Sequence, residues 1–140
     1  TGSHGVTVKA DLKPEEISFN NIDGVVLPGG MPGTVNLGKS ETVTKAAVYC
    51  AENGKITAAI CAAPSVLGNL GILKGKKATC FPGFEKELEG ATYTAAPVEI
   101  DGNVITGKGA GCAILFGKAI VEKAVSAEAA NKVCGDMQCP

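Results

Sequence analysis

Short apolar runs alternate with segments of helical periodicity along this chain. The continuous runs within Asp23–Gly30 and Lys55–Ile60 have the length and composition of buried parallel strands. Val6–Ala10 alternates like a half-buried strand, and Lys76–Cys80 predicts a further strand. Because helix-like segments separate these runs, the pattern predicts a mostly parallel sheet with helices on both faces.

Helix signals flank the second of these strands. Ser40 is a suitable N-cap for a helix that ends near Asn53 and Gly54, after MPGTVNLG, which we expect to be a turn. A second helix is expected after Lys55–Ile60, with Pro64 in its first turn and Gly71 at its end.

The C-terminal third predicts a hairpin followed by two helices. Asp101-Gly102 stands between two β-rich runs, which is a strong hairpin signal. We expect a helix from about Cys112 to Val125 and a shorter helix capped by Ser126. Without repeats, linkers or low-complexity segments, residues 1–140 are expected to form a single domain.

Composition and charge narrow the classes of partner. The 13 basic and 14 acidic residues are spread along the chain, so no basic stripe is present to bind nucleic acid. No apolar run approaches the ~20 residues of a membrane helix, and TGSHGVTVKAD is unlike a signal peptide. We therefore expect a soluble, cytoplasmic protein with neither nucleic acid nor membrane as a partner.

The chain contains six cysteines and a single histidine, His4. Four cysteines fall inside helix or strand patterns rather than in disulfide-stapled loops, so we expect reduced thiols. Without a C-x-x-C pair, a zinc site is poorly supported. Cys134 and Cys139 form a C-x4-C pair near the C-terminus, where a frayed tail is favoured over a metal clip.

Two glycine-rich stretches resemble phosphate-binding motifs. GTVNLGKS, Gly33–Ser40, fits G-x-x-x-x-G-K-[ST], but PGGMP separates it from the preceding strand, and the next strand ends in Cys61 rather than in an aspartate. GKGAG, Gly107–Gly111, follows a hairpin rather than opening a βαβ unit. We therefore interpret GTVNLGKS as a chance match, and GKGAG as a place where the backbone closely approaches a neighbouring site.

The stretch ITAAICAAPSVL carries the strongest functional signal. Cys61 stands between a buried strand and a helix, among small residues that permit a sharp turn, as in a nucleophile elbow. Its side chain would lie at the carboxyl edge of the sheet, where the helix start favours a thiolate. The amides of Ala62 and Gly30 would stabilise an oxyanion beside the sulfur. The alternative interpretation is a buried structural cysteine.

With its LPGG loop, AAICAAP elbow and late GKGAG loop before a helix, the chain resembles the DJ-1/ThiJ/PfpI superfamily over essentially its whole length. The resemblance implies a flavodoxin-like α/β three-layer sandwich, class I glutamine amidotransferase-like, with a mostly parallel sheet and usually a homodimer. It implies Cys61 as the reactive cysteine, backbone amides from Gly30 and Ala62, and neither cofactor nor metal. The other candidate site-lining residues are Gly29, Cys80, Phe81, Gly109 and Cys112.

Several positions depart from the family pattern. The peptidase branch has a histidine directly after the nucleophile, where this chain has Ala62, so a cysteine peptidase or amidase would lack its general base. Phe81 stands where well-known members have a histidine before a proline. In the late loop, often R-G-P-G-T, the chain has Lys108, Ala110 and Cys112 in place of Arg, Pro and Thr.

The largest departure is at the N-terminus. Family members begin with a strand, helix and strand of about 45 residues, which supply the central strand and a glutamate that hydrogen-bonds to the cysteine. This chain starts near the third family strand. Because a sheet without its central strand exposes unpaired edges, we expect the missing segment to accompany this domain, as another chain or as an omitted part of the same polypeptide.

Three functions follow from the resemblance. The first is a glutathione-independent glyoxalase or deglycase that acts through Cys61 on α-oxoaldehydes such as methylglyoxal or on glycated proteins. The second is a redox-sensing, stress-protective or chaperone-like protein, in which Cys61 is oxidised. A peptidase or amidase is the third. Cys80 or Cys112 is either a resolving thiol or an apolar filler, and His4 is either a solvated turn residue or lies near a dimer partner's site.

Overall fold

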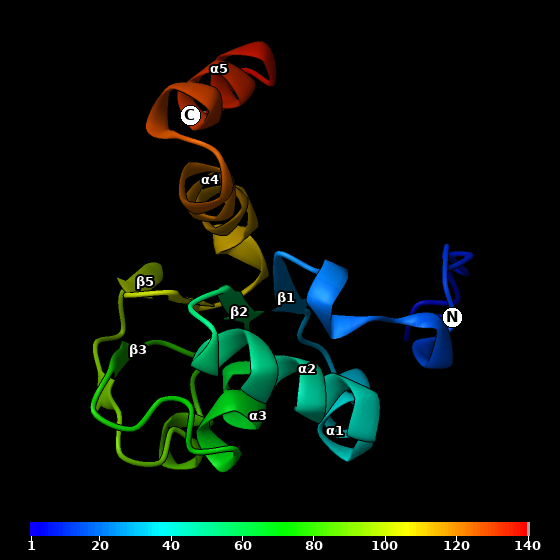
Figure 1. Ribbon diagram of the computed structural model, residues 1–140. Helices are drawn as coiled ribbons and strands as arrows, with labels where there is room; N and C mark the ends of the chain where they lie inside the picture. The colour runs from blue at the N-terminus through cyan, green and yellow to red at the C-terminus, as the bar shows by residue number, and fades with distance from the viewer. Residues whose placement is uncertain (140) are drawn as a thin grey trace.

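Four strands form the central sheet of the computed structural model, which describes residues 1–139 (Figure 1). Their order is β1-β2-β6-β5, in which β1, β2 and β6 are parallel and β5 is antiparallel to β6. A separate two-stranded parallel sheet joins β3 and β4. The strands are β1 (Gly24–Leu27), β2 (Ile56–Ile60), β3 (Lys77–Ala78), β4 (Thr92–Tyr93), β5 (Val98–Asp101) and β6 (Val104–Gly107).

Helices cover both faces of the central sheet. The α-helices are α1 (Gly33–Lys39), α2 (Glu41–Glu52), α3 (Pro64–Asn69), α4 (Ala113–Ala124) and α5 (Ala127–Asp136). Short 3-10 helices span Pro14–Glu16, Phe19–Asn21, Glu85–Glu87 and Ala110–Cys112. Figure 1 shows α1, α2 and α3 on one face and α4 on the other, with α5 outside α4. Within residues 1–139, no helix has both the length and the apolar composition to cross a membrane.

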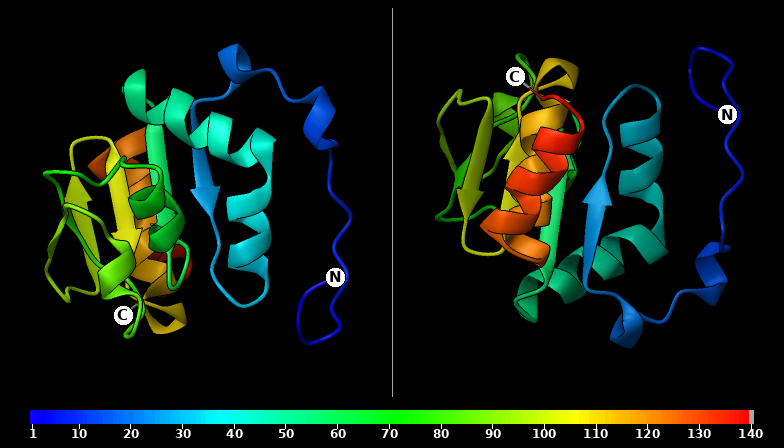
Figure 2. Two further views of the ribbon diagram at one scale, coloured as in Figure 1. Left: turned by 90° about the horizontal axis from the view of Figure 1, so that it is seen from below. Right: turned by 90° about the horizontal axis from the view of Figure 1, so that it is seen from above.

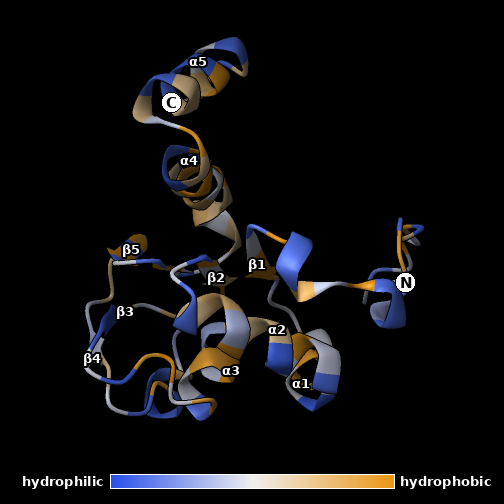
Figure 3. Ribbon diagram, in the orientation of Figure 1, coloured by the Kyte–Doolittle hydropathy of each residue, from blue (hydrophilic) through white to orange (hydrophobic). Residues whose placement is uncertain are grey.

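The core lies on both sides of the sheet because neighbouring residues of each strand point to opposite faces. Ala59 and Val104 pack with Leu67 on the face that α2 and α3 cover. Their neighbours Ala58 and Ile105 pack against α4 on the other face. Figure 3 shows both hydrophobic and hydrophilic segments on α3, α4 and α5, as expected for helices with one buried side. The predicted mostly parallel sheet with helices on both faces is confirmed.

The strand register brings three loops to one edge of the sheet. Leu27 is paired with Ala59, and Ile60 with Gly107, so β1, β2 and β6 end at nearly the same level. Cys61 follows β2 directly at this edge, beside the loops that follow Leu27 and Gly107. The carboxyl edge of a parallel sheet is the usual ligand-binding position in open α/β folds.

The N-terminal stretch differs from its prediction. Val6–Ala10 forms no strand, and its residues are exposed, with Val8 80% accessible. Strands gain stability from a paired ladder and a covered face, and this stretch has neither within residues 1–139. Figure 2 shows it at the side of the molecule, beyond β1 and α1. The alternation of apolar and polar residues alone was therefore insufficient to predict a strand.

The other predicted elements lie close to their expected positions. The hairpin at Asp101-Gly102 joins β5 to β6, with Gly102 in the left-handed region at φ 65°. Helices α2 to α5 match the predicted helices, and Ser126 caps α5 by accepting from the Ala129 amide at 3.1 Å. The strand expected over Lys76–Cys80 is shorter, because only Lys77–Ala78 is paired.

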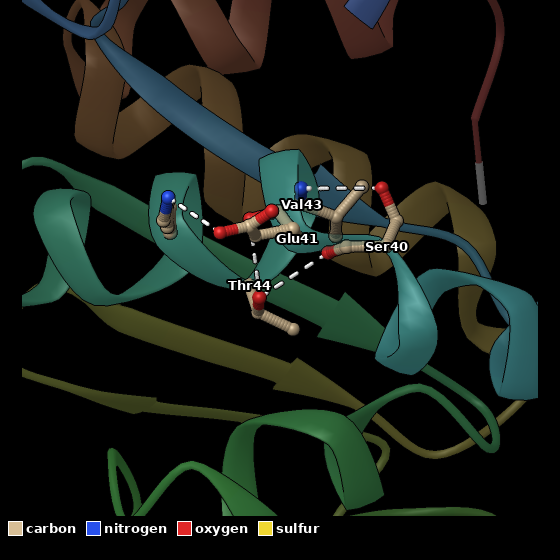
Figure 4. Close-up of polar contacts among 5 residues, drawn as sticks. Ser40, Glu41, Val43 and Thr44 are labelled. Carbon is tan, nitrogen blue, oxygen red and sulfur yellow. Dashed lines mark hydrogen bonds and ion pairs between the residues drawn. The ribbon is translucent and has the colours of Figure 1, made fainter.

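The stretch Gly33–Lys39 is helical rather than a turn, which corrects the prediction for MPGTVNLG. Helix α1 occupies Gly33–Lys39, and Ser40 then caps α2 by accepting from the Val43 amide at 3.5 Å (Figure 4). The Thr44 hydroxyl donates to the Ser40 carbonyl at 3.2 Å. A phosphate-binding loop needs amides free to face its ligand, whereas this stretch forms a helix and a cap.

Candidate active site

Cys61 occupies a strained turn between β2 and α3. Its φ is 67°, in the left-handed region that costs a residue with a side chain roughly 1–2 kcal/mol. Two backbone hydrogen bonds hold this conformation: the Cys61 amide donates to the Gly107 carbonyl, and the Phe81 amide donates to the Cys61 carbonyl, each at 2.8 Å. Neighbouring chain segments therefore fix the elbow, and the Cys61 side chain remains half-exposed.

The loop after β1 closes against this turn at Gly29. A Cβ atom at Gly29 would lie 2.5 Å from the Cys61 Cβ and 2.8 Å from the Ile60 carbonyl oxygen, so no larger residue fits without a shift. The next residue, Gly30, has φ 88°. Its carbonyl accepts from the amide of Thr34 at 2.8 Å and from its hydroxyl at 3.0 Å, which anchors the loop to α1. The LPGG sequence thus serves a close backbone approach.

Two backbone amides beside the cysteine have no partner. Within residues 1–139, neither the Gly30 nor the Ala62 amide donates a hydrogen bond to another group. Ala62 is 3% exposed, and its nitrogen lies 3.1 Å from the position that a Gly29 Cβ would take. Gly30 is exposed, so only the Ala62 amide is a buried donor without an acceptor, which is costly. Backbone donors at such positions stabilise an oxyanion when one forms beside them.

Cys80 and Phe81 form another wall of the elbow. Cys80 is fully buried, and this burial, followed by the charges of Glu85 and Cys61, raises the pKa of its thiol to about 11. The side chain of Phe81 is about half-exposed, while its backbone amide donates to the Cys61 carbonyl. Cys80 therefore lies near Cys61 but keeps its proton at neutral pH.

Glu85 was missed by the sequence analysis. Its carboxylate accepts from the Gly83 amide at 2.9 Å, and this hydrogen bond lowers the pKa of Glu85. The resulting negative charge contributes to the raised pKa of Cys80. The turn sequence FPGFE, with its acidic residue just after proline and glycine, was the available signal. No carboxylate within residues 1–139 hydrogen-bonds to Cys61.

The late loop is only partly joined to the elbow. Gly109 lies beside Phe81, since a Cβ atom there would be 3.4 Å from the Phe81 ring. Cys112 donates its amide to the Gly109 carbonyl at 2.9 Å and precedes α4. Cys112 is half-buried and has no hydrogen bond to Cys61 in the part of the chain described. The structure thus brings Gly29, Ala62, Cys80 and Phe81 to Cys61, with Gly30 following Gly29 in the loop and Gly109 behind Phe81.

A cavity of about 410 Å³ lies between the N-terminal turn and the glycine loop. His4, Gly30 and Asn36 are among the residues that line it. The His4 ring is exposed and lies 3.2 Å from the Ser3 hydroxyl through Nδ1. No group of three His, Cys, Asp or Glu side chains in residues 1–139 is placed to hold a metal ion.

Comparison with known proteins identifies the family. The model of the DJ-1/PfpI family matches residues 1–123. The chain belongs to this family. Protein DJ-1 homolog B of Arabidopsis thaliana is 37% identical over 136 residues, which is 96% of this chain and 31% of that protein. The deglycase PfpI of Pyrococcus furiosus is 35% identical over 111 residues, 77% of this chain and 66% of that protein.

A solved relative confirms the DJ-1-type, flavodoxin-like fold. The oxidized DJ-1 of Toxoplasma gondii superposes with a TM-score of 0.90 at 32% identity. The match covers 97% of this chain and 74% of the Toxoplasma chain. This chain therefore spans about a third of the Arabidopsis protein's length and about two thirds to three quarters of the length of the other two.

Proposed function

We propose that Cys61 is the nucleophile of a deglycase- or glyoxalase-type reaction on small α-oxoaldehydes or on their early adducts with proteins. The observation that carries this proposal is the strained elbow at φ 67°, with two amides free beside it. Strained backbone is often retained at active sites, where it positions a reacting group. The family relation adds support, because the relative from Pyrococcus furiosus is named a deglycase.

The first chemical step is the addition of Cys61 to an aldehyde carbon. The thiolate forms a sulfur–carbon bond as the carbonyl π bond breaks, and the electron pair moves to the oxygen. This oxyanion would accept hydrogen bonds from the Gly30 and Ala62 amides and then take a proton, giving a hemithioacetal. Donors that the backbone holds in place need no rearrangement when the charge develops.

The later proton transfers at carbon need an acid/base group. Conversion of an α-oxoaldehyde to a 2-hydroxy acid adds one water molecule overall, and a proton must move between adjacent carbons. No carboxylate within residues 1–139 hydrogen-bonds to Cys61 for this task. We therefore propose that another part of the assembly supplies this acid. The proposed substrate is a small carbonyl compound or a glycated protein, and the proposed protein is a cytoplasmic homodimer.

Oxidation of Cys61 is the second candidate function. A sulfinate at this sulfur would present two oxygens to the same amides of Gly30 and Ala62, so those donors suit an oxidised cysteine as well as an oxyanion. Two observations favour it: the half-exposed Cys61 side chain, and the oxidized state of the Toxoplasma relative. A peptidase remains unsupported, because Ala62 follows the nucleophile and His4 is exposed.

The test compares wild type with Cys61→Ala. We expect wild type to convert methylglyoxal to the hydroxy acid, and Cys61→Ala to lose about two orders of magnitude or more in kcat/KM. Cys134→Ser, a half-exposed position in α5, is the matched control and should keep wild-type turnover. Equal turnover by Cys61→Ala would exclude the enzymatic proposal. Absence of turnover in wild type, with peroxide adding two oxygens at Cys61, would favour the redox candidate.

A further inference from the structure

The C-terminal end of α5 has a specific turn geometry. The Gln138 amide donates to the Gly135 carbonyl at 3.0 Å, and the Cys139 amide donates to the Cys134 carbonyl at 2.9 Å. Gln138 itself lies in the left-handed region at φ 54°. This pair of bonds around one left-handed residue is a Schellman motif, in which Cys134 is the C3 residue and Cys139 the C″ residue. The tail described here is therefore an ordered helix end.

The Schellman motif commonly brings the C3 and C″ side chains into contact. In this chain both are cysteines, and both line the groove of about 340 Å³ between α4 and α5. Partial burial is the main cause that raises the pKa of the Cys139 thiol, and the adjacent Cys134 side chain raises it further. Both cysteines are reduced and half-exposed. The turn thus places two accessible thiols side by side.

We propose that Cys134 and Cys139 form a reversible dithiol–disulfide site that is oxidised by small hydroperoxides. The site lies in α5 and the turn after it, outside residues 1–123 that match the family model. It involves none of the residues around Cys61, so it is independent of the function proposed above. A pair five residues apart with a shared turn needs little chain entropy to close.

The oxidation is a balanced two-electron step. One thiolate attacks a peroxide oxygen, the O–O bond breaks, and a sulfenic acid and one water or alcohol molecule form. The second thiolate then attacks the sulfenic sulfur, the S–O bond breaks, and a second water leaves as the disulfide forms. In total two thiols and one hydroperoxide give one disulfide, one water and one water or alcohol. A low-molecular-weight thiol reverses the step by exchange.

A structural metal site fits Cys134 and Cys139 less well than a disulfide does. A structural zinc site needs four ligands, and residues 1–139 contain no cluster of three His, Cys, Asp or Glu side chains suited to a metal. Lys118 is a nearby cation, which lowers the pKa of Cys139 and would repel a metal ion. Two thiols without further ligands favour disulfide formation.

Closure of the disulfide would fix the end of α5 over the start of α4. The groove that Cys134 and Cys139 line also includes Ala113 and Ile114, the first residues of α4. The left-handed conformation of Gln138, which a residue other than glycine adopts at a cost, would then be held by a covalent bond. Oxidation should therefore stabilise this corner of the molecule without altering the sheet.

The test maps disulfides in the full chain after oxidation. Reduced wild type is treated with hydrogen peroxide, free thiols are blocked with N-ethylmaleimide, and the protein is digested with trypsin. Cleavage after Lys132 gives a peptide that starts at Val133 and holds both cysteines. We expect this peptide to lose two hydrogens and to take up no maleimide until dithiothreitol is added. Met137 sulfoxide is distinguished because it persists in dithiothreitol.

Variants separate the site from the other cysteines. Cys61→Ala should form the same intrapeptide disulfide, whereas Cys134→Ser and Cys139→Ser should not. In a glutathione redox buffer, Gln138→Val should lower the disulfide-to-dithiol ratio about fivefold or more relative to Gln138→Gly, because a β-branched residue opposes the left-handed turn. The proposal is overturned if both wild-type thiols remain open to maleimide, if each is oxidised separately, or if the two Gln138 variants give equal ratios.

Discussion

Within residues 1–139, Cys61 lies close to Cys80, and Cys134 lies close to Cys139. Different kinds of contact hold these two pairs together. Cys61 and Cys80 belong to segments 19 residues apart, joined by the bond from the Phe81 amide to the Cys61 carbonyl at 2.8 Å. Cys134 and Cys139 are five residues apart, and one helix end brings them together. The first pair depends on the tertiary structure, and the second on local hydrogen bonds.

This difference separates the chemistry of the two pairs. At the elbow, Cys80 is buried and its thiol has a pKa of about 11, so Cys61 is the accessible sulfur there. At the end of α5, both thiols are half-exposed. A disulfide needs both sulfurs to react in turn. We therefore expect single-thiol chemistry at the elbow and paired-thiol chemistry at the C-terminal turn.

The largest expected effect comes from Gly29→Ala, which breaks the elbow alone. The new Cβ would lie 2.5 Å from the Cys61 Cβ and 2.8 Å from the Ile60 carbonyl, so backbone must move. We expect the free energy of unfolding to fall by about 2 kcal/mol and the alkylation rate of Cys61 to change. Urea unfolding and iodoacetamide kinetics measure the two effects.

Gly33→Ala is the matched control for this change. Gly33 lies in the same loop region as the first residue of α1, and a Cβ there meets no atom within 4 Å. Its stability should equal or exceed that of wild type, because alanine favours the helix. In both variants the disulfide between Cys134 and Cys139 should form as in wild type. Equal stability of the two variants would show that Gly29 is not required for the close approach.

The pH dependence of Cys80 tests the burial of the elbow pair. Its pKa is raised from 9.0 to about 11 in the folded protein, so the folded state disfavours the thiolate. The resulting stability is present below pH 9 and is lost as the pH rises toward 11. Urea unfolding from pH 8 to 11 should show a smaller loss in Cys80→Ala than in wild type, because burial also raises the pKa of Cys50 and of Tyr93.

The alkylation rate of Cys80 gives an independent measurement. At pH 8 the thiolate fraction should be about a hundredfold smaller in the folded protein than in the urea-unfolded chain, since each pKa unit is a factor of ten. Peptide mapping after iodoacetamide distinguishes Cys80 from the other cysteines. Rapid labelling of Cys80 in the folded protein would contradict its burial and would reopen its role as a resolving thiol.

The elbow was predictable from sequence because local signals agree there. A continuous apolar run predicted β2, Pro64 marked the first turn of α3, and the small residues around Cys61 permitted the sharp turn. The bond from Phe81 to Cys61 was not predictable, because it joins segments that no local pattern relates.

Local signals failed where tertiary contacts decided the conformation. Gly33 and Gly38 lowered the helix propensity of α1, yet Leu37 packs against the core and the segment is helical. Val6–Ala10 alternates well but has no partner strand within residues 1–139. The C-terminal Schellman motif was hidden because glutamine, rather than glycine, occupies its left-handed position at Gln138.

The smallest expected effect comes from Ser126→Ala, which weakens the helix that carries Cys134 and leaves the elbow intact. The Ser126 hydroxyl accepts from the Ala129 amide at 3.1 Å, and loss of such a cap costs about 1 kcal/mol. Hydrogen exchange should accelerate several-fold in α5 and stay unchanged in β2, because α5 is an outer helix that contacts the rest through α4 (Figure 1). Ser126→Asp keeps a capping oxygen and should behave like wild type. If α5 exchanges equally in the alanine and aspartate variants, the helix is held by its packing on α4, and the cysteine pair depends on tertiary structure as the elbow does.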